Sequence, residues 1–267
     1  MRNLLDIVAK AALAVLLIAG VGYAEDTRME ILATADQSRG WEAVGRLDFG
    51  GDGFCTAALV TSDIVLTAAH CLYDNATGKP VPPEKIQFRA GLRYGRAEAY
   101  RGIRRIVVHP DYAIEDVDRL SVIGSDLALL ELDRPVRATH VKPFRTHLAI
   151  REGDEVQVVS YAKDRAEAPS REESCKVLTR DRDILVLSCS VDFGSSGAPV
   201  FVRQGDEVRI VSVISAKAAW DDKPVALAAV MEGEFEALLS EFARTPALAP
   251  VGNKTVRPRE VRPTSSD

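Results

Sequence analysis

The chain has 267 residues, of which 46% are hydrophobic, and its formal net charge at pH 7 is −5. This supply of apolar residues is sufficient for one large all-β domain or two small packed barrels. The negative charge gives no reason to expect nucleic acid or an anionic membrane as a partner.

The first 24 residues have the pattern of a secretory signal peptide. The basic residues Arg2 and Lys10 precede an uncharged apolar run, 11–20. The small residue Ala24 then stands at a suitable cleavage position. A membrane span is the alternative, but a span needs about 20 apolar residues and this run is shorter. We therefore expect a secreted or periplasmic protein without stable membrane insertion, its mature part beginning at Glu25.

Residues 25–40 are polar and unpatterned, so we expect an N-terminal extension there and a single folded domain over 41–244. Within this domain, short β-branched and aliphatic runs alternate with turn residues, which predicts antiparallel strands. The predicted strands are 43–49, 56–60, 64–67, 85–90, 103–108 and 126–132, then 155–162, 176–180, 184–188, 198–202, 207–215 and 225–231. Six runs in each half predict an all-β fold of two six-stranded antiparallel barrels, joined near 134–153.

The last part of the chain has a different pattern. Phe235, Leu238, Leu239 and Phe242 recur at helical spacing, which predicts a closing amphipathic helix over 233–244. The residues after it, 245–267, are rich in proline and poor in large apolar side chains, so we expect a disordered tail.

Three short stretches carry residue types that act together in nucleophilic catalysis. His70 follows an apolar strand in a turn of small residues, Asp126 leads directly into the apolar run 127–130, and Ser196 lies in a Gly/Ser-rich turn. A serine hydroxyl becomes a nucleophile when a neighbouring base takes its proton, and that base needs a third group to fix its tautomer.

Other residues could fill two of these roles. Glu115, Asp116 and Asp118 are also acidic, but they lie in a charged segment that is more typical of a solvated loop. Ser195 stands directly before Ser196 and is an alternative nucleophile.

The three stretches, read in order, resemble the chymotrypsin/trypsin-like serine peptidases over about 41–231. That family has Thr-Ala-Ala-His-Cys, then Asp-hydrophobic-Ala-Leu-Leu, then Gly-x-Ser-Gly-x-Pro, and this chain has Thr-Ala-Ala-His-Cys at 67–71, Asp-Leu-Ala-Leu-Leu at 126–130 and Gly-Ser-Ser-Gly-Ala-Pro at 194–199. The resemblance implies that His70 is the general acid/base, Asp126 orients it and Ser196, rather than Ser195, is the nucleophile. It also implies an oxyanion hole made by the backbone N–H groups of Gly194 and Ser196.

The same resemblance implies a reaction. We expect a serine endopeptidase that hydrolyses protein or peptide substrates through an acyl-enzyme intermediate, without metal or organic cofactor. The alternative is a catalytically silent relative that uses the fold for binding. The sequence does not indicate an oligomeric state.

The chain has four cysteines, an even number, as expected where disulfides persist. No Cys-x-x-Cys pair or Cys/His cluster favours a metal site instead. Four cysteines allow three connectivities. The resemblance implies a Cys55–Cys71 bridge, and Cys175 and Cys189 flank two strand-like runs whose hairpin would bring them together.

The resemblance also implies where the substrate side chain binds. Ser190 would form the base of the primary pocket and Ser215 and Ala216 one wall, while the cysteine pair that usually braces this pocket is missing. These residues favour an uncharged, small or medium apolar residue at the cleaved position, and specificity for glutamate stays open. Ser195 replaces an aspartate used in activation by many animal members, so we expect no such switch, as in many bacterial secreted members.

Overall fold

The structure is a computed structural model that describes residues 29–51, 53–114, 120, 122–146 and 149–246. The predicted signal peptide, the predicted tail beyond 246 and the alternative acids at 115–118 lie outside these residues. In the described part of the chain, no helix is long and apolar enough to cross a membrane.

The first half of the chain forms a closed antiparallel barrel in the strand order β2-β3-β4-β7-β6-β5. Its strands are β2 Val44–Asp48, β3 Phe54–Leu59, β4 Ile64–Thr67, β5 Gln87–Ala90, β6 Ala99–Val108 and β7 Ala128–Leu132. All five residues of β7 are buried, four of them apolar, and the carboxylate of the fifth, Glu131, pairs with Arg104 and Arg105. Asp126, just before this strand, is thereby held at the edge of the core.

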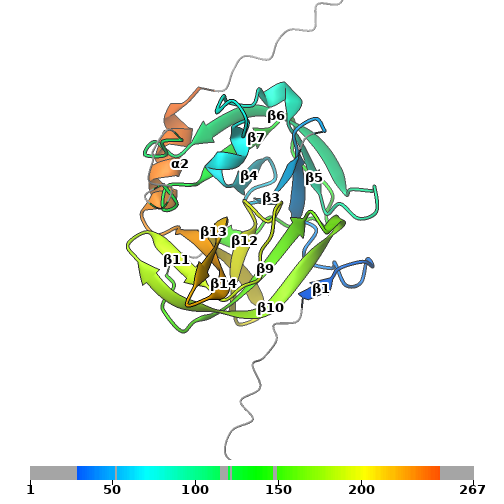
Figure 1. The fold of residues 1–267 in the computed structure, drawn as a ribbon. Coiled ribbons are helices and arrows are strands. Elements are labelled where there is room, and N and C mark those ends of the chain that lie inside the picture. The colour runs from blue at the N-terminus through cyan, green and yellow to red at the C-terminus, as the bar shows by residue number, and fades with distance from the viewer. Residues whose placement is uncertain (1–28, 52, 115–119, 121, 147–148, 247–267) are drawn as a thin grey trace, which may run out of the picture.

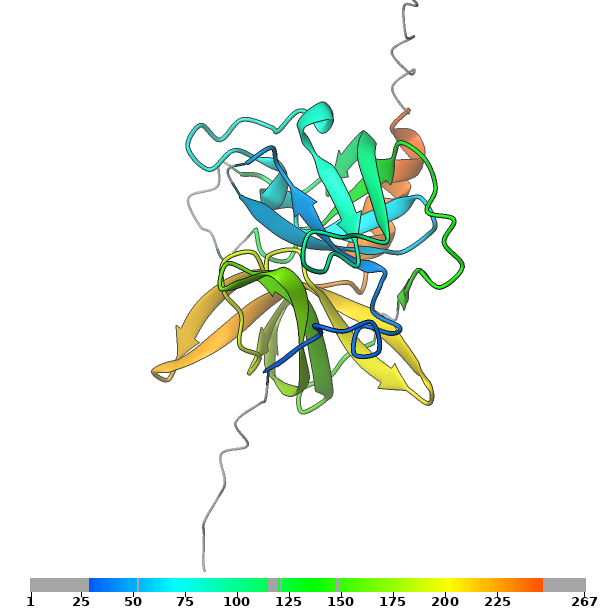
Figure 2. The ribbon, with the colours of Figure 1, turned by 90° about the vertical axis from the view of Figure 1, so that its right-hand side faces the viewer.

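The second half forms an eight-stranded sheet, of which six strands pair in a ring because β9 pairs with both β12 and β10. These six strands are β9 Glu155–Ala162, β10 Arg165–Asp181, β11 Ile184–Leu187, β12 Pro199–Gln204, β13 Glu207–Trp220 and β14 Lys223–Val230. The predicted all-β class with two six-stranded barrels is confirmed. Figures 1 and 2 show the two units stacked, with the first above the second.

The ring carries two further strands that the sequence patterns do not predict. β1, Met29–Ile31, pairs with β10, and β8, Arg145–Thr146, runs parallel to β13. The first part of β10, from Arg165, is also strand, although it lacks an alternating apolar pattern; the backbone partners on β9 and β1 supply the hydrogen bonds. Pairing with neighbouring strands, rather than local composition, thus determines that these segments are strands.

One α-helix and two 3-10 turns complete the described fold: α2 Glu234–Arg244, η1 Ala69–Leu72 and η2 Pro83–Lys85. The helix packs on β6 and β7 at the side of the first barrel (Figure 2). It buries Phe235 and Leu238, two of the residues that predicted it.

Three aromatic rings join the two barrels. Trp41 lies before β2, Phe144 lies in the connection and Phe201 lies on β12, with ring centroids 5.1 Å apart for Trp41–Phe201 and 4.6 Å for Phe144–Phe201. The buried hydroxyl of Tyr161 on β9 also donates to the carbonyl of Leu92, 2.9 Å away. Contacts of this kind hold the two barrels in one fixed arrangement, so residues contributed by both can form a site.

Candidate active site

His70 lies in η1, the tight turn that follows β4. The neighbouring Cys71 forms a disulfide with Cys55 on β3, and Cys175 forms the second disulfide with Cys189. The first bridge ties the turn of His70 to the adjacent strand. Since both cysteines are oxidised, they offer no thiolate to a metal beside this histidine.

Asp126 holds His70 by two hydrogen bonds. Its Oδ2 lies 2.6 Å from the imidazole Nδ1, and its Oδ1 accepts the backbone N–H of His70 at 2.8 Å. Asp126 is buried, and its Oδ2 also accepts the hydroxyl of Ser215 on β13. Because Oδ1 holds the backbone of His70 while Oδ2 holds its ring, the carboxylate fixes the orientation of the imidazole.

The same contact changes the proton affinity of His70. Burial opposes the charged imidazolium, but the negative charge of Asp126 and its hydrogen bond outweigh that cost and raise the pKa of His70 above its ordinary value. With Nδ1–H donated to Asp126, neutral His70 presents its Nε2 lone pair as a base.

The turn that carries Ser196 is attached to β3 of the first barrel. The carbonyl of Ser196 accepts the N–H of Thr56 at 2.8 Å, and the carbonyl of Gly194 accepts the Thr56 hydroxyl at 2.9 Å. Thr56 is completely buried, and no motif in the sequence marked it. It adjoins Cys55, the disulfide partner of the residue after His70, so β3 links both candidate catalytic residues.

Gly197 shows how closely the two barrels approach here. Its φ is +78°, and a Cβ at this position would lie 2.1 Å from Thr67 Oγ1, 2.2 Å from the carbonyl oxygen of Thr56 and 3.1 Å from the backbone nitrogen of Ala68. Only glycine combines this conformation with this contact. The residue after Ser196 is therefore pressed against the segment that leads to His70.

Within the described residues, no hydrogen bond joins the Ser196 hydroxyl to His70, whose Nε2 lies 3.9 Å from Cys71 Sγ. Such bonds are often long in free enzymes and shorten when substrate binds. The structure therefore brings His70 and Asp126 into direct contact and places Ser196 on the adjoining turn.

The peptide groups around Ser196 alternate in their hydrogen bonding. The N–H groups of Ser195 and Gly197 donate to the carbonyls of Asp192 and Ile214, at 2.9 and 2.8 Å. In the part of the chain that the structure describes, the N–H groups of Gly194 and Ser196 have no acceptor. Two free donors on one turn, from the residues predicted to form the oxyanion hole, can bind a developing negative charge.

Ser195 and Ser196 differ in their surroundings. Ser195 is buried, and its hydroxyl lies 3.2 Å from Ser160 Oγ and 3.4 Å from the carbonyl of Tyr161. Ser196 is half-buried and faces no such pair of internal partners. The environment therefore favours Ser196 over Ser195 as the group that reaches a substrate.

The residues predicted to line the primary pocket have unequal roles in the structure. Ser190 is exposed, and its N–H donates to Oε2 of Glu172, a completely buried carboxylate, at 2.7 Å. Ala216 is half-buried on β13, whereas the hydroxyl of Ser215 is committed to Asp126. The sequence offered no signal for Glu172, because the contact joins segments that lie apart in the chain.

A second histidine site lies away from Ser196. His109 is buried; its Nδ1 accepts the N–H of Asp111 at 3.2 Å, and its Nε2 lies 3.2 Å from Oε2 of Glu234. Although the two groups are close, Nε2 has no hydrogen-bond partner among the described residues. The contact brings the residue after β6 close to the first residue of α2.

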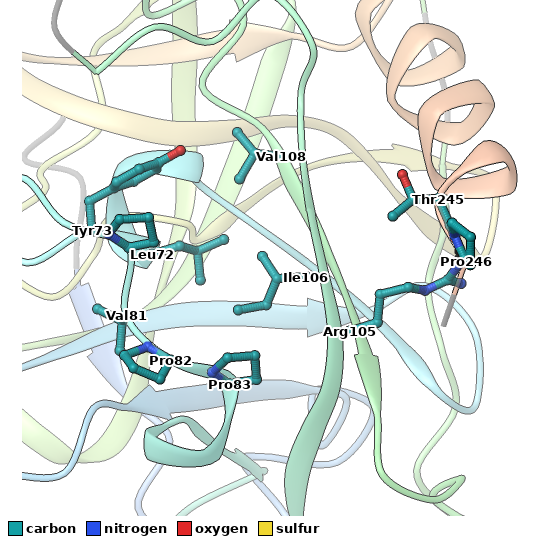
Figure 3. Close-up of a pocket in the computed structure, with 11 residues that line it drawn as sticks. Leu72, Tyr73, Val81, Pro82, Pro83, Arg105, Ile106, Val108, Thr245 and Pro246 are labelled. Atoms are coloured by element: carbon teal, nitrogen blue, oxygen red, sulfur yellow. Dashed lines mark hydrogen bonds between the residues drawn. The ribbon is translucent and has the colours of Figure 1, made fainter. Parts of the chain in front are cut away.

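The cavity in Figure 3 has a volume of about 350 Å³ and is lined on one side by Leu72 of η1. Leu72, Tyr73, Ile106 and Val108 are among its mostly apolar lining, and Arg105 is the one charged side chain among the described residues that line it. None of the candidate catalytic residues lines it, so its chemistry is separate from theirs.

We expect Gly197→Ala to be much more destabilising than Gly205→Ala. Both glycines have positive φ, +78° and +60°, but a Cβ at Gly205 meets no atom within 4 Å. The conformational cost of about 1–2 kcal/mol is common to both, whereas overpacking at Gly197 adds a further ~1–3 kcal/mol. Urea unfolding of the two variants measures the difference; equal losses would contradict the close contact with Thr56 and Thr67.

Comparison with known proteins supports the same assignment. The family profile described as Trypsin matches residues 33–230. The chain is 37% identical over 93 residues to Modular serine protease of Drosophila melanogaster, covering 33% of this chain and 14% of that protein. It is 32% identical over 98 residues to Trypsin of Phaedon cochleariae, covering 36% and 34%. The chain thus spans about a third or less of the length of these relatives.

Solved structures share the fold at lower identity. A Glu endopeptidase in complex with MPD aligns with a TM-score of 0.67 and 18% identity, covering 82% of this chain and 97% of that one. The thermostable serine protease AL20 from an extremophilic microorganism aligns with a TM-score of 0.61 and 19% identity, covering 75% and 97%. Because the family profile matches well over half of the sequence, the chain belongs to the trypsin family of serine peptidases.

Proposed function

We propose that this protein is a serine endopeptidase in which Ser196 is the nucleophile, His70 the general acid/base and Asp126 the residue that orients His70. The observation that carries the proposal is the buried carboxylate of Asp126, bonded to both the backbone and Nδ1 of His70. Holding a histidine in the tautomer that leaves Nε2 free is the function of the acid in such a triad.

In the proposed reaction, Nε2 of His70 takes the hydroxyl proton of Ser196 while Oγ attacks the carbonyl carbon of the scissile peptide bond. The carbonyl oxygen becomes an oxyanion and accepts the free N–H groups of Gly194 and Ser196. The C–N bond then breaks, and His70 gives its proton to the leaving amine. Water, deprotonated by His70, then attacks the resulting ester; the bond between the acyl carbon and Ser196 Oγ breaks, His70 returns the proton to Oγ, and the carboxylic acid product leaves.

The alternative, a catalytically silent relative that serves in binding, predicts the loss of a triad residue, and all three are present. We further propose that the protein is secreted or periplasmic, which its two disulfides support. The relatives described above are animal proteins and do not support the bacterial secreted type. That part of the proposal rests on Ser195 alone. Ser195 bonds to uncharged groups, which supports activity without a newly formed N-terminus.

We propose that the primary pocket accepts an uncharged, small or medium apolar side chain. Ser190 and Ala216 bring no charge to it. The charged neighbours Asp192 and Lys217 bind each other, with 2.7 Å between Oδ1 and Nζ, so neither is left to select an opposite charge on the substrate.

A fluorophosphonate probe should label the wild-type protein at Ser196, and Ser196→Ala should abolish the labelling. Ser195→Ala is the matched control. It removes a buried hydroxyl one position earlier, and the variant should still be labelled at Ser196. Mass spectrometry of the modified peptide identifies the site. Labelling that survives in Ser196→Ala would refute this choice of nucleophile.

The rate should depend on the pKa of His70. Only neutral His70 accepts a proton, so kcat/KM should fall as the pH drops through an apparent pKa above 6.5, the ordinary value for this side chain. Asp126→Asn removes the charge but leaves the burial, so the fall should move to lower pH, and the plateau should decrease by about 10⁴-fold. Glu234→Gln, which alters the partner of the other buried histidine, is the control; an unmoved profile in Asp126→Asn would contradict this account.

Specificity can be measured with peptides that differ only at the cleaved position. Alanine, valine and leucine should give kcat/KM at least about 10-fold above arginine, lysine and glutamate, because Ser190 and Ala216 offer no opposite charge to a charged side chain. Strong cleavage after arginine or lysine would refute the uncharged pocket. A preference for glutamate would show instead that Lys217 can leave Asp192.

A further inference from the structure

The turn that carries Ser196 is tied to β13 by an exposed group of three side chains. Lys217 lies 2.7 Å from Oδ1 of Asp192 and, at 4.1 Å from the ring centroid, over Phe193. Asp192 and Phe193 belong to the turn, whereas Lys217 follows Ser215 on β13. The contact therefore connects the segment before the proposed nucleophile to the strand that holds Asp126.

Asp192 is also the residue that shapes the turn. Its Oδ1 accepts the N–H of Phe193 at 2.8 Å, and its carbonyl accepts the N–H of Ser195 at 2.9 Å. Gly194, inside this turn, has a φ of +97°. Because the carboxylate that binds Lys217 also binds the N–H of Phe193, the ion pair and the turn share one oxygen atom.

The neighbouring peptide group is fixed from its other side. The carbonyl of Phe193 accepts the N–H of Lys163 at 2.8 Å. The N–H of Gly194 belongs to the same peptide plane and points away from that carbonyl, and among the described residues it has no acceptor. The orientation of one proposed oxyanion-hole donor thus depends on how Phe193 is held.

The ion pair itself is a weak source of stability. The side chains of Asp192 and Lys217 are 45% and 50% exposed, and pairs as exposed as this contribute little to folding. A hydrogen bond from Lys217 lowers the pKa of Asp192, so the carboxylate stays charged at neutral pH. Catalysis is more sensitive than stability to such a contact, since a donor slightly out of place binds the transition state less well.

We propose that Asp192 and Lys217 are positioning residues that hold the Phe193–Gly194 peptide in its catalytic orientation. This inference rests on the proposed function, because it assumes that the N–H of Gly194 stabilises an oxyanion. The pair acts on the rate of the chemical step and has little effect on substrate binding or on folding.

The test compares Lys217→Met with Lys217→Arg. Methionine keeps an unbranched apolar chain beside Phe193 but loses the charge, whereas arginine keeps both the charge and the contact with the ring. Loss of one oxyanion donor costs about 10²- to 10³-fold in kcat, and a misplaced donor should cost less, about 10-fold. We expect that decrease in Lys217→Met and Asp192→Asn, with KM and the thermal midpoint nearly unchanged and activity restored in Lys217→Arg.

Glu232→Gln is the matched control. It removes the charge from another exposed ion pair, Arg180–Glu232, with 2.9 Å between Nη1 and Oε2, and should leave kcat unchanged. Added salt should lower kcat of the wild type but not of Lys217→Met, because salt screens an exposed pair.

The outcomes separate this inference from the function on which it rests. A wild type that reacts with a fluorophosphonate and hydrolyses peptide, together with an unchanged kcat in Lys217→Met, would overturn the positioning role alone. A wild type that does neither would overturn the proposed peptidase activity and the positioning role with it. A rise in KM at constant kcat would also overturn it, since Lys217 would then be a substrate-binding residue.

Discussion

The candidate site depends on one close contact between the two barrels. Gly197 lies against the carbonyl of Thr56 and the hydroxyl of Thr67, with no space for a Cβ. Thr56 also binds the carbonyls of Ser196 and Gly194. The turn of Ser196, which belongs to the second barrel, is thereby fixed on a strand of the first barrel, and that barrel carries His70 and Asp126.

Electrostatics is organised around Asp126. It accepts bonds from the backbone and ring of His70 in one barrel and from Ser215 in the other. A buried carboxylate needs such donors, since an unpaired charge in the interior is costly. The negative charge of Asp126 and its bond to the imidazole raise the pKa of His70, and that bond also holds the ring. The contacts that satisfy the buried carboxylate of Asp126 are therefore also the contacts that orient His70, the proposed general base.

The sequence predicted the fold class well because most strands carry their own signal. β4 and β9 match the predicted runs residue for residue, since β-branched residues alternate or cluster there between turn residues. β1 and the beginning of β10 lack that signal and became strands through pairing with neighbours. The motifs around His70, Asp126 and Ser196 were recognisable because each is short and contiguous.

The sequence alone determined the family, the type of barrel and the residues that could perform the chemistry, since these depend on short contiguous motifs and on the pattern of apolar residues. Only the tertiary structure decided which distant groups meet. Thr56 beneath Ser196, Glu172 beneath Ser190 and Lys217 beside Asp192 are such pairs. The physical reason is that strand register and barrel packing, rather than neighbouring residues, set which polar groups find a partner.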